Sequence, residues 1–200
     1  MPSEAACSLR SLAAAKMIPP RLIAKLCGSG TTIQMLNIFV SRPTTIEPAF
    51  ESAYTDFDLF LTSKNIRSRR LGGGDYSRQA PLKAVFRIID ECCGAIILGY
   101  PQLTLRHEVR RSAKPQNDWG YVLPTPWNQI EGALAYRAET PVLVIAHHGI
   151  EGGVFDFGVT GEGVTHLDLS APKWFLSPQF EQPFAEWLAE VGSYTTTNLS

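Results

Sequence analysis

Short apolar runs alternate along the chain with longer segments whose apolar residues recur at helical spacing. The runs LNIFVS (36–41), GAIILGY (94–100) and PVLVIAHH (141–148) have the length and near-continuous hydrophobicity of buried strands. Weaker strand patterns lie at NIRSRR (65–70) and VTHLDL (164–169). The chain is therefore expected to form five strands separated by other elements.

Between these runs, apolar residues recur every three or four positions, which predicts helices with one buried face. The expected helices lie near residues 46–61, 82–89, 126–140 and 180–191. Thr44 and Glu47 match a capping box at the start of the first helix. Thr125 and Pro126 have the residue types preferred at the N-cap and first position of the third.

The alternation of strands and helices predicts an α/β fold with right-handed crossovers between parallel strands. The specific expectation is a single flavodoxin-like three-layer sandwich with a five-stranded, mainly parallel sheet. In such sheets ligands bind at the carboxyl ends of the strands, near the point where the strand order reverses. The loops that follow the strands are therefore the first place to look for a functional site.

The first part of the chain differs in composition from the rest. Residues 1–34 are rich in Ala, Ser and Leu, and CGSGTT separates them from the first strand. We interpret them as an N-terminal extension, poorly ordered or weakly helical, or alternatively as an over-extended start with Met35 as the true initiator. The predicted folded domain spans residues 35–193, with a tail at 194–200.

The composition of the chain argues against several classes of binding partner. The chain is 44% apolar and 18% charged with a net charge of -1, which is typical of a globular protein without a basic field for nucleic acid. Its apolar runs are far shorter than a membrane span. Four cysteines without zinc-ligand spacing suggest reduced thiols, a cytoplasmic setting and no metal site.

The strand-end rule selects a small group of polar and flexible residues as the candidate site. Some end a strand or lie in the loop that follows it, and others lie in the first turns of the next helix. The candidates for substrate binding are Ser41, Arg42, Thr44, Gly73, Asp75, Tyr76, Tyr100, Trp127 and Asn128, and Glu131 is the candidate catalytic group.

Two of these segments suggest particular contacts. SRPTT (41–45) joins a strand end to a helix start, where backbone N–H groups and the helix dipole favour a phosphate that Arg42 could pair with. The alternative is an ordinary helix start with an exposed arginine. GGGDYSR (72–78) would let the backbone approach a ligand, with Asp75 accepting from a ribose, or would form a flexible surface loop.

Glu131 is the residue on which the functional interpretation depends. It follows Trp127 and Asn128 by four and three residues, which places all three on neighbouring positions of the predicted helix. We expect Ile130 and Leu134 to dock on the sheet and Glu131 to lie at the edge of that buried stripe. Such a carboxylate either assists the breaking of a glycosidic bond or is an ordinary solvated helix residue.

NIFVSRPT, APLKAVFRIIDECCGAIILGY, PWNQIEGALA and PVLVIA together resemble the TIR-domain and nucleoside 2-deoxyribosyltransferase superfamily. In that pattern a tryptophan followed by a glutamate opens a helix, and the glutamate is catalytic in active members. Here Trp127 and Glu131 match those positions. The resemblance spans about residues 36–190 as a pattern of elements and a few residues.

The resemblance implies cleavage of an N-glycosidic bond in a nucleotide or nucleoside, as an NAD hydrolase or a deoxyribosyltransferase-like enzyme. Glu131 would be the catalytic carboxylate, and NAD or another nucleotide would be the substrate without a separate cofactor. A homo-oligomer is implied by the same resemblance. The alternatives are a non-catalytic nucleotide-sensing domain and a TIR-type protein-interaction module.

Overall fold

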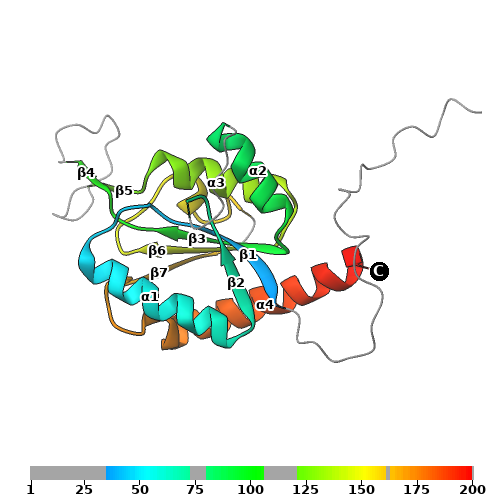
Figure 1. Cartoon of the computed structure of the whole chain (residues 1–200). Coiled ribbons are helices and arrows are strands. Elements are labelled where there is room, and N and C mark those ends of the chain that lie inside the picture. Colours follow the sequence, from blue (N-terminus) through cyan, green and yellow to red (C-terminus); the bar gives the residue numbers. More distant parts are fainter. Residues whose placement is uncertain (1–34, 73–79, 106–120, 161–162, 200) are drawn as a thin grey trace, which may run out of the picture.

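The computed structural model describes residues 35–72, 80–105, 121–160 and 163–199 of the 200-residue chain (Figure 1). Its main sheet contains five parallel strands in the order β2-β1-β3-β6-β7. These are β1 (Leu36–Ser41), β2 (Ile66–Arg69), β3 (Gly94–Gly99), β6 (Val142–His147) and β7 (Val164–Leu167). The predicted flavodoxin-like α/β fold is confirmed.

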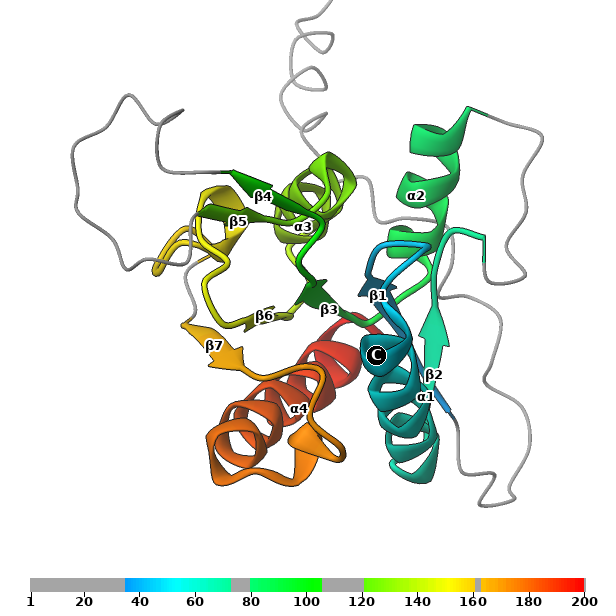
Figure 2. The same cartoon turned by 90° about the vertical axis from the view of Figure 1, so that its left-hand side faces the viewer.

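Helices cover both faces of this sheet, which gives the three layers. They are α1 (Pro48–Ser63), α2 (Pro81–Asp90), α3 (Pro126–Arg137) and α4 (Pro178–Leu199), with short 3-10 turns η2 (Gly153–Phe155) and η3 (Trp174–Leu176). Figures 1 and 2 show α1 and α4 on one face and α2 and α3 on the other.

The strand order reverses next to β1. The chain passes from β1 to β2 on one side of the sheet, and then from β2 across β1 to β3 on the other side. Ser41 at the end of β1 is paired in register with Ile97 of β3. The switch point of the fold, where ligands bind in open α/β sheets, is therefore the gap between the carboxyl ends of β1 and β3.

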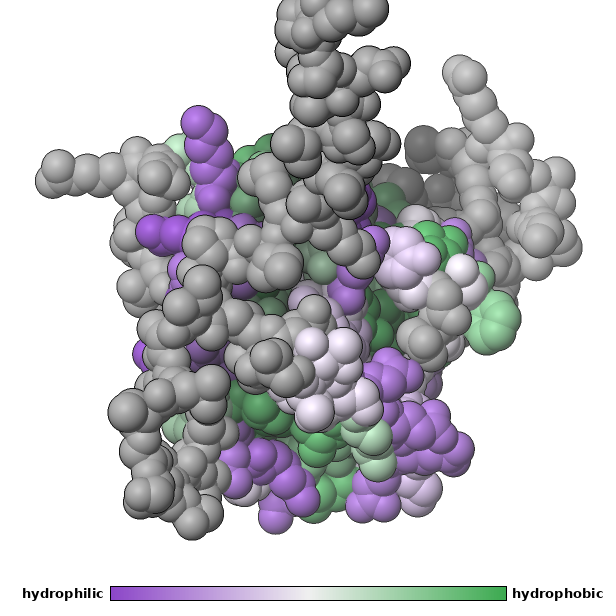
Figure 3. All heavy atoms as spheres, turned by 90° about the vertical axis from the view of Figure 1, so that its right-hand side faces the viewer, coloured by the Kyte–Doolittle hydropathy of each residue, from purple (hydrophilic) through white to green (hydrophobic). Residues whose placement is uncertain are grey.

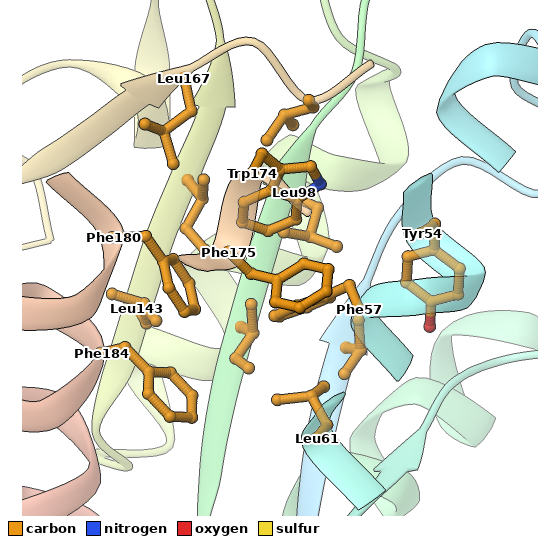
Figure 4. Packing of buried hydrophobic residues seen from close by; sticks show 14 of the residues in the cluster. Tyr54, Phe57, Leu61, Leu98, Leu143, Leu167, Trp174, Phe175, Phe180 and Phe184 are labelled. Atoms are coloured by element: carbon orange, nitrogen blue, oxygen red, sulfur yellow. The ribbon is translucent and has the colours of Figure 1, made fainter. Parts of the chain in front are cut away.

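The face under α1 and α4 is filled with aromatic side chains (Figure 4). Phe57 of α1 is fully buried, and its ring centroid lies 4.7 Å from that of Trp174 and 5.8 Å from that of Phe180. Phe184 and Trp187 extend the cluster along α4. Aromatic packing of this kind adds to the free energy gained from burial alone, so this face is the main stabilising core.

The face under α2 and α3 is built from smaller side chains. Val85 and Ile88 of α2 and Ala135 of α3 pack on Phe39 and Val144 of the sheet. A side chain at Gly132 would lie 3.0 Å from Val154, so the absence of a Cβ lets α3 approach η2 closely. This face leaves room for polar groups at the carboxyl ends of the strands.

Four features differ from the sequence-based expectations. Helix α1 begins at Pro48 with Glu47 as its N-cap and no side-chain capping bond, so the predicted capping box is wrong. Within the expected loop 101–124, Leu103–Leu105 and Tyr121–Leu123 pair as the antiparallel strands β4 and β5.

Helix α4 continues to Leu199, so the residues expected to form a tail from 194 belong to this helix. On α2, Val85 and Ile89 are buried as the spacing predicts, but Leu82 and Phe86, which belong to the same expected stripe, are about 40% exposed. Ala84 and Ile88 are buried in their place. The helical period was right, but its phase was shifted.

The end of the molecule opposite the carboxyl ends of the strands carries interspersed polar and apolar patches over the described surface (Figure 3). No helix within the four described ranges is long and apolar enough to cross a membrane.

Candidate active site

Ser41 lies at the carboxyl end of β1, next to the central strand β3. Side chains alternate along β1, so Ile38 and Val40 face α1 while Phe39 and Ser41 face α2 and α3. Ser41 is only 1% exposed. A hydroxyl so deeply buried requires hydrogen-bond partners, and helix α3 provides them.

Helix α3 turns a polar face toward the sheet. Its buried residues are Asn128, Glu131, Gly132 and Ala135. The expectation that Ile130 would dock on the sheet is wrong, because Ile130 is 42% exposed. Glu131 therefore lies on the inward face and is 8% exposed, rather than at the edge of an apolar stripe.

Thr125 caps α3 as predicted, and the same hydroxyl also orients the side chain of Asn128. The Thr125 hydroxyl accepts a hydrogen bond from the backbone N–H of Asn128, as an N-cap should, at 3.2 Å. The same hydroxyl donates to the side-chain oxygen of Asn128 at 2.9 Å. The cap thus fixes the orientation of the Asn128 amide, with its nitrogen directed at the sheet.

From Asn128 a chain of hydrogen bonds leads to the carboxylate. Asn128 Nδ2 donates to Ser41 Oγ at 2.9 Å, and Ser41 Oγ donates to Glu131 Oε2 at 2.5 Å. Asn128 Nδ2 also lies 3.4 Å from the carbonyl oxygen of Leu98 in β3. Because each group accepts from one neighbour and donates to the next, the chain directs a hydrogen bond specifically at Oε2.

Glu131 has the electrostatic character of a reactive group. Burial raises its pKa to about 7, although the hydrogen bond from Ser41 acts in the opposite direction. Its other oxygen, Oε1, receives no hydrogen bond from any residue that the structure describes. A carboxyl group with a pKa near neutrality, held at one oxygen only, is a candidate for acid, base or nucleophilic chemistry.

A cavity of about 440 Å³ adjoins Glu131. Trp127 and Thr125 of α3 line it, as do Pro81 and Ala84 at the start of α2. The chain that follows β1 and β2 closes the remaining side with Arg42, Pro43, Thr44, Arg70, Leu71 and Gly72. This volume lies within the range of small-molecule sites, and it opens where the fold is expected to bind a ligand.

Arg42 lines the cavity but is already paired. Its guanidinium donates from Nη1 and Nη2 to the two carboxylate oxygens of Glu51, each at 3.0 Å, and from Nη1 to the carbonyl oxygen of Pro43. Its side chain is only 5% exposed. The pair with Glu51 neutralises most of its charge, so the structure favours a positioned Arg42 over the exposed one considered from the sequence.

Trp127 is 43% exposed and borders the cavity. Its ring is therefore accessible to a ligand and is not buried against the sheet. Thr44 also borders the cavity, but it does not cap α1. Of the predicted set, the structure brings together Ser41, Arg42, Thr44, Trp127, Asn128 and Glu131 at one end of the sheet.

Tyr100 does not belong to this group. It is fully buried in the aromatic cluster beneath α1, with its ring edge-on to Phe50 at 5.5 Å. It shares a strand face with Leu98, and that face is opposite the one that carries Ser41. The predicted contacts of Gly73, Asp75 and Tyr76 lie outside the described residues.

The histidines after β6 also lie apart from the cavity. The backbone N–H of Leu169 donates to His147 Nδ1 at 3.2 Å, and the His147 ring packs edge-on against Phe50 at 5.0 Å. Burial lowers the pKa of His147, while the neighbouring Asp168 raises it. These contacts fix His147 within the fold on the α1 side of the sheet.

The sequence interpretation missed two residues of interest. Arg70 directly follows β2 and lines the cavity. The strand-end rule applies to this position and could have selected it. Gln129 of α3 donates to the carbonyl oxygen of Gly152 and accepts from the backbone N–H of Val154, each at 3.0 Å. Those bonds clamp the η2 turn to α3, and no local pattern predicts them.

A second hollow, of about 710 Å³, lies at the opposite end of the sheet. It is lined by the end of α3, the start of β6 and the second half of α4. It is larger than the cavity beside Glu131, but it contains none of the residues of the hydrogen-bonded chain. The smaller cavity is therefore the candidate site, because the buried carboxylate and the switch point coincide there.

Comparison with known proteins identifies no matching family model and no matching curated sequence. Within the described residues, no group of three or more His, Cys, Asp or Glu side chains is arranged to hold a metal ion. The functional argument for this chain consequently rests on the geometry of its own residues.

Proposed function

We propose that this chain cleaves the N-glycosidic bond of a nucleotide or nucleoside, with Glu131 as the catalytic carboxylate. The observation that supports it most is the environment of Glu131. Ser41 holds one oxygen, and the other has no donor among the described residues beside a cavity at the strand ends. NAD is the substrate we favour, because the chain resembles the TIR-domain and deoxyribosyltransferase superfamily.

The proposed reaction begins with the breaking of the C1′–N bond, whose electron pair leaves with the base. Nicotinamide departs from NAD as a neutral molecule, because its ring nitrogen is positively charged in the substrate. The ionised carboxylate of Glu131 stabilises the positive charge at C1′ or bonds to it. Water then supplies the hydroxyl at C1′ and releases a proton, whereas a second base in place of water gives transfer.

The neighbouring residues have distinct roles in this proposal. Ser41 and Asn128 are positioning residues, since they act on Glu131 and do not line the cavity. Trp127 borders the cavity with an exposed ring that can stack on the leaving base. A carboxylate held by a chain of bonds loses less conformational freedom during the reaction than a free one does.

The ionised form of Glu131 is the reactive one, which sets a pH dependence. Burial raises the pKa of this group to about 7, so the carboxylate is the minor form below that pH. The rate of base release should therefore rise with pH and level off above about pH 7. A rate profile measured from pH 5 to pH 9 checks this expectation.

The direct test is base release by the purified full chain. NAD and a panel of nucleosides and nucleotides are incubated with it, and free bases are measured by mass spectrometry. We expect Glu131→Gln to lower the rate by about 10²- to 10⁴-fold, since it removes the ionisable group but keeps the shape of the side chain. Glu186→Gln, at an exposed position of α4, is the matched control and should retain full activity.

Each outcome of this test has a definite meaning. If Glu131→Gln releases base as fast as the unaltered protein, the catalytic assignment is wrong. If the unaltered protein binds a nucleotide in calorimetry but releases no base, the chain is a nucleotide sensor. Binding of none of these compounds would favour a protein-interaction module.

A further inference from the structure

The cavity continues away from Glu131 into a small recess between the ends of β1 and β2. This arginine recess has a volume of about 60 Å³ and is lined by Arg42, Pro43, Thr44, Arg70, Leu71 and Gly72. All six residues also line the main cavity, so the two spaces are continuous. Neither Glu131 nor Trp127 borders the recess, which places it at the end of the cavity remote from both.

Two guanidinium groups border the recess, and they differ in whether a carboxylate is paired with them. Arg42 is held by both carboxylate oxygens of Glu51. Arg70 is partly exposed and forms no ion pair with a carboxylate in the described part of the chain. Both groups lie over the ring of Tyr54, Arg42 at 4.2 Å and Arg70 at 5.5 Å from its centroid.

Arg42 provides an independent sign of a missing partner. Its side chain is about 95% buried, and its Nε has no hydrogen-bond acceptor among the described residues. Buried donors in native proteins are nearly always satisfied by protein, water or ligand. The recess is thus lined by one arginine without an ion pair among the described residues and by a second arginine that carries a buried donor without an acceptor there.

We propose that the arginine recess binds a phosphate group of the substrate, with Arg70 as the main charged contact. This inference rests on the proposed function and narrows its substrate class to phosphorylated nucleotides. Nucleosides, which have no phosphate, are then poor substrates. The recess is too small for a base, whereas a compact tetrahedral oxyanion matches both its size and its donors.

The physical basis is the geometry of the guanidinium group. Its planar set of N–H donors matches two oxygens of a phosphate, and such charge-assisted bonds are about twice as strong as neutral ones. The guanidinium of Arg70 lies over the ring of Tyr54, which restricts the arginine side chain. Less side-chain freedom is therefore lost when the phosphate binds. With its phosphate anchored here, a nucleotide extends along the cavity toward Trp127 and Glu131.

The experiment measures binding without turnover. In the Glu131→Gln background, calorimetry compares adenosine, guanosine, cytidine, uridine and nicotinamide riboside with their 5′-monophosphates. We expect at least one phosphorylated member to bind about 10- to 100-fold more tightly than its unphosphorylated partner. Adding Arg70→Gln should abolish that advantage, and inorganic phosphate should compete for it.

Arg67→Gln is the matched control, because Arg67 is an exposed arginine of β2, the strand that Arg70 follows, and its loss changes the net charge equally. That variant should retain the preference for phosphate. The inference is overturned if no phosphorylated compound is preferred, if the preference survives Arg70→Gln, or if Arg67→Gln abolishes it as well.

The two proposals fail in different ways. A phosphate preference that depends on Arg70, in a protein that releases no base, supports the recess and contradicts the enzymatic function. Release of base from nucleosides as fast as from nucleotides, with no effect of Arg70→Gln, supports the enzymatic function and contradicts the phosphate site.

Discussion

The two faces of the sheet are built on different principles. Beneath α1 and α4, aromatic rings interlock around Phe57, and the cluster consists almost entirely of apolar side chains (Figure 4). Beneath α2 and α3, a serine, an asparagine and a glutamate are buried in a row beside a cavity. One sheet thus separates the region that stabilises the fold from the region that holds buried polar groups.

This division has an energetic cost that falls on one face only. Burying most of a carboxyl group opposes folding, whereas aromatic burial favours it. A protein can retain a strained or polar site when the rest of its core supplies enough stability. The two faces should consequently respond in opposite directions when their central residues are replaced.

The largest expected effect on stability comes from the aromatic face. Phe57→Ala removes a fully buried ring from the centre of the cluster and should lower the free energy of unfolding by about 3–5 kcal/mol. Urea denaturation followed by tryptophan fluorescence measures this change. Leu59→Ala on the same helix is the control, since Leu59 is 65% exposed and its loss should change stability by less than about 0.5 kcal/mol.

A cost below about 1 kcal/mol for Phe57→Ala would mean that the aromatic cluster is not the main source of stability. The contrast between the two faces would then lose its energetic basis, even if their compositions differ.

The second effect has the opposite sign and depends on pH. The pKa of Glu131 is raised from 4.5 to about 7 in the folded chain, so the folded state holds its proton more tightly than the unfolded state does. The contribution of Glu131 to stability is therefore fully present below pH 4.5, is lost as the pH rises from 4.5 to 7, and stays lost above 7. Glu131→Gln removes this dependence.

Between pH 5 and pH 8, the stability of Glu131→Gln should increase relative to the unaltered protein by about 2 kcal/mol. Urea denaturation at the two pH values measures the difference, and Glu186→Gln on the surface of α4 is the matched control. A difference that does not change with pH would show that Glu131 is ionised at no cost in the folded chain.

The fold followed from the sequence because its signals are local. Apolar runs of strand length and stripes of helical spacing survive in any context, and they located all five strands of the main sheet. The hairpin of β4 and β5 was missed because two strands of three residues leave almost no periodic signal. The phase of α2 was missed because Ala84 packs inward where the larger Leu82 was expected.

The site was predicted less well, for a different physical reason. Hydrophobicity assigns Ile130 to the interior and Glu131 to its edge, but the fold reverses them. What makes a buried Glu131 tolerable is a hydrogen bond from Ser41, which lies 90 residues earlier in the chain. Such compensation between distant residues leaves no periodic trace, and local rules fail most often at functional positions.

The prediction for Tyr100 failed because it also depends on residues that are distant in the sequence, in this case on a neighbouring strand. The strand-end rule placed it near Ser41, and the two residues do end neighbouring strands. Their relative faces depend on the register, in which Ser41 is opposite Ile97, so that Tyr100 points to the other side of the sheet with Leu98. Alternation within a strand is readable from the sequence, whereas the register between strands is not.

The smallest predicted effect concerns the start of the polar chain on the α2 and α3 face. Thr125→Ala removes the N-cap of α3 and the hydrogen bond that orients Asn128, and should lower the free energy of unfolding by about 1 kcal/mol. Thr125→Ser retains the hydroxyl and should restore most of that loss. If the serine variant loses as much stability as the alanine variant, the methyl group of Thr125, and not its hydroxyl, holds the start of α3. The orientation of Asn128 toward Ser41 would then require another explanation.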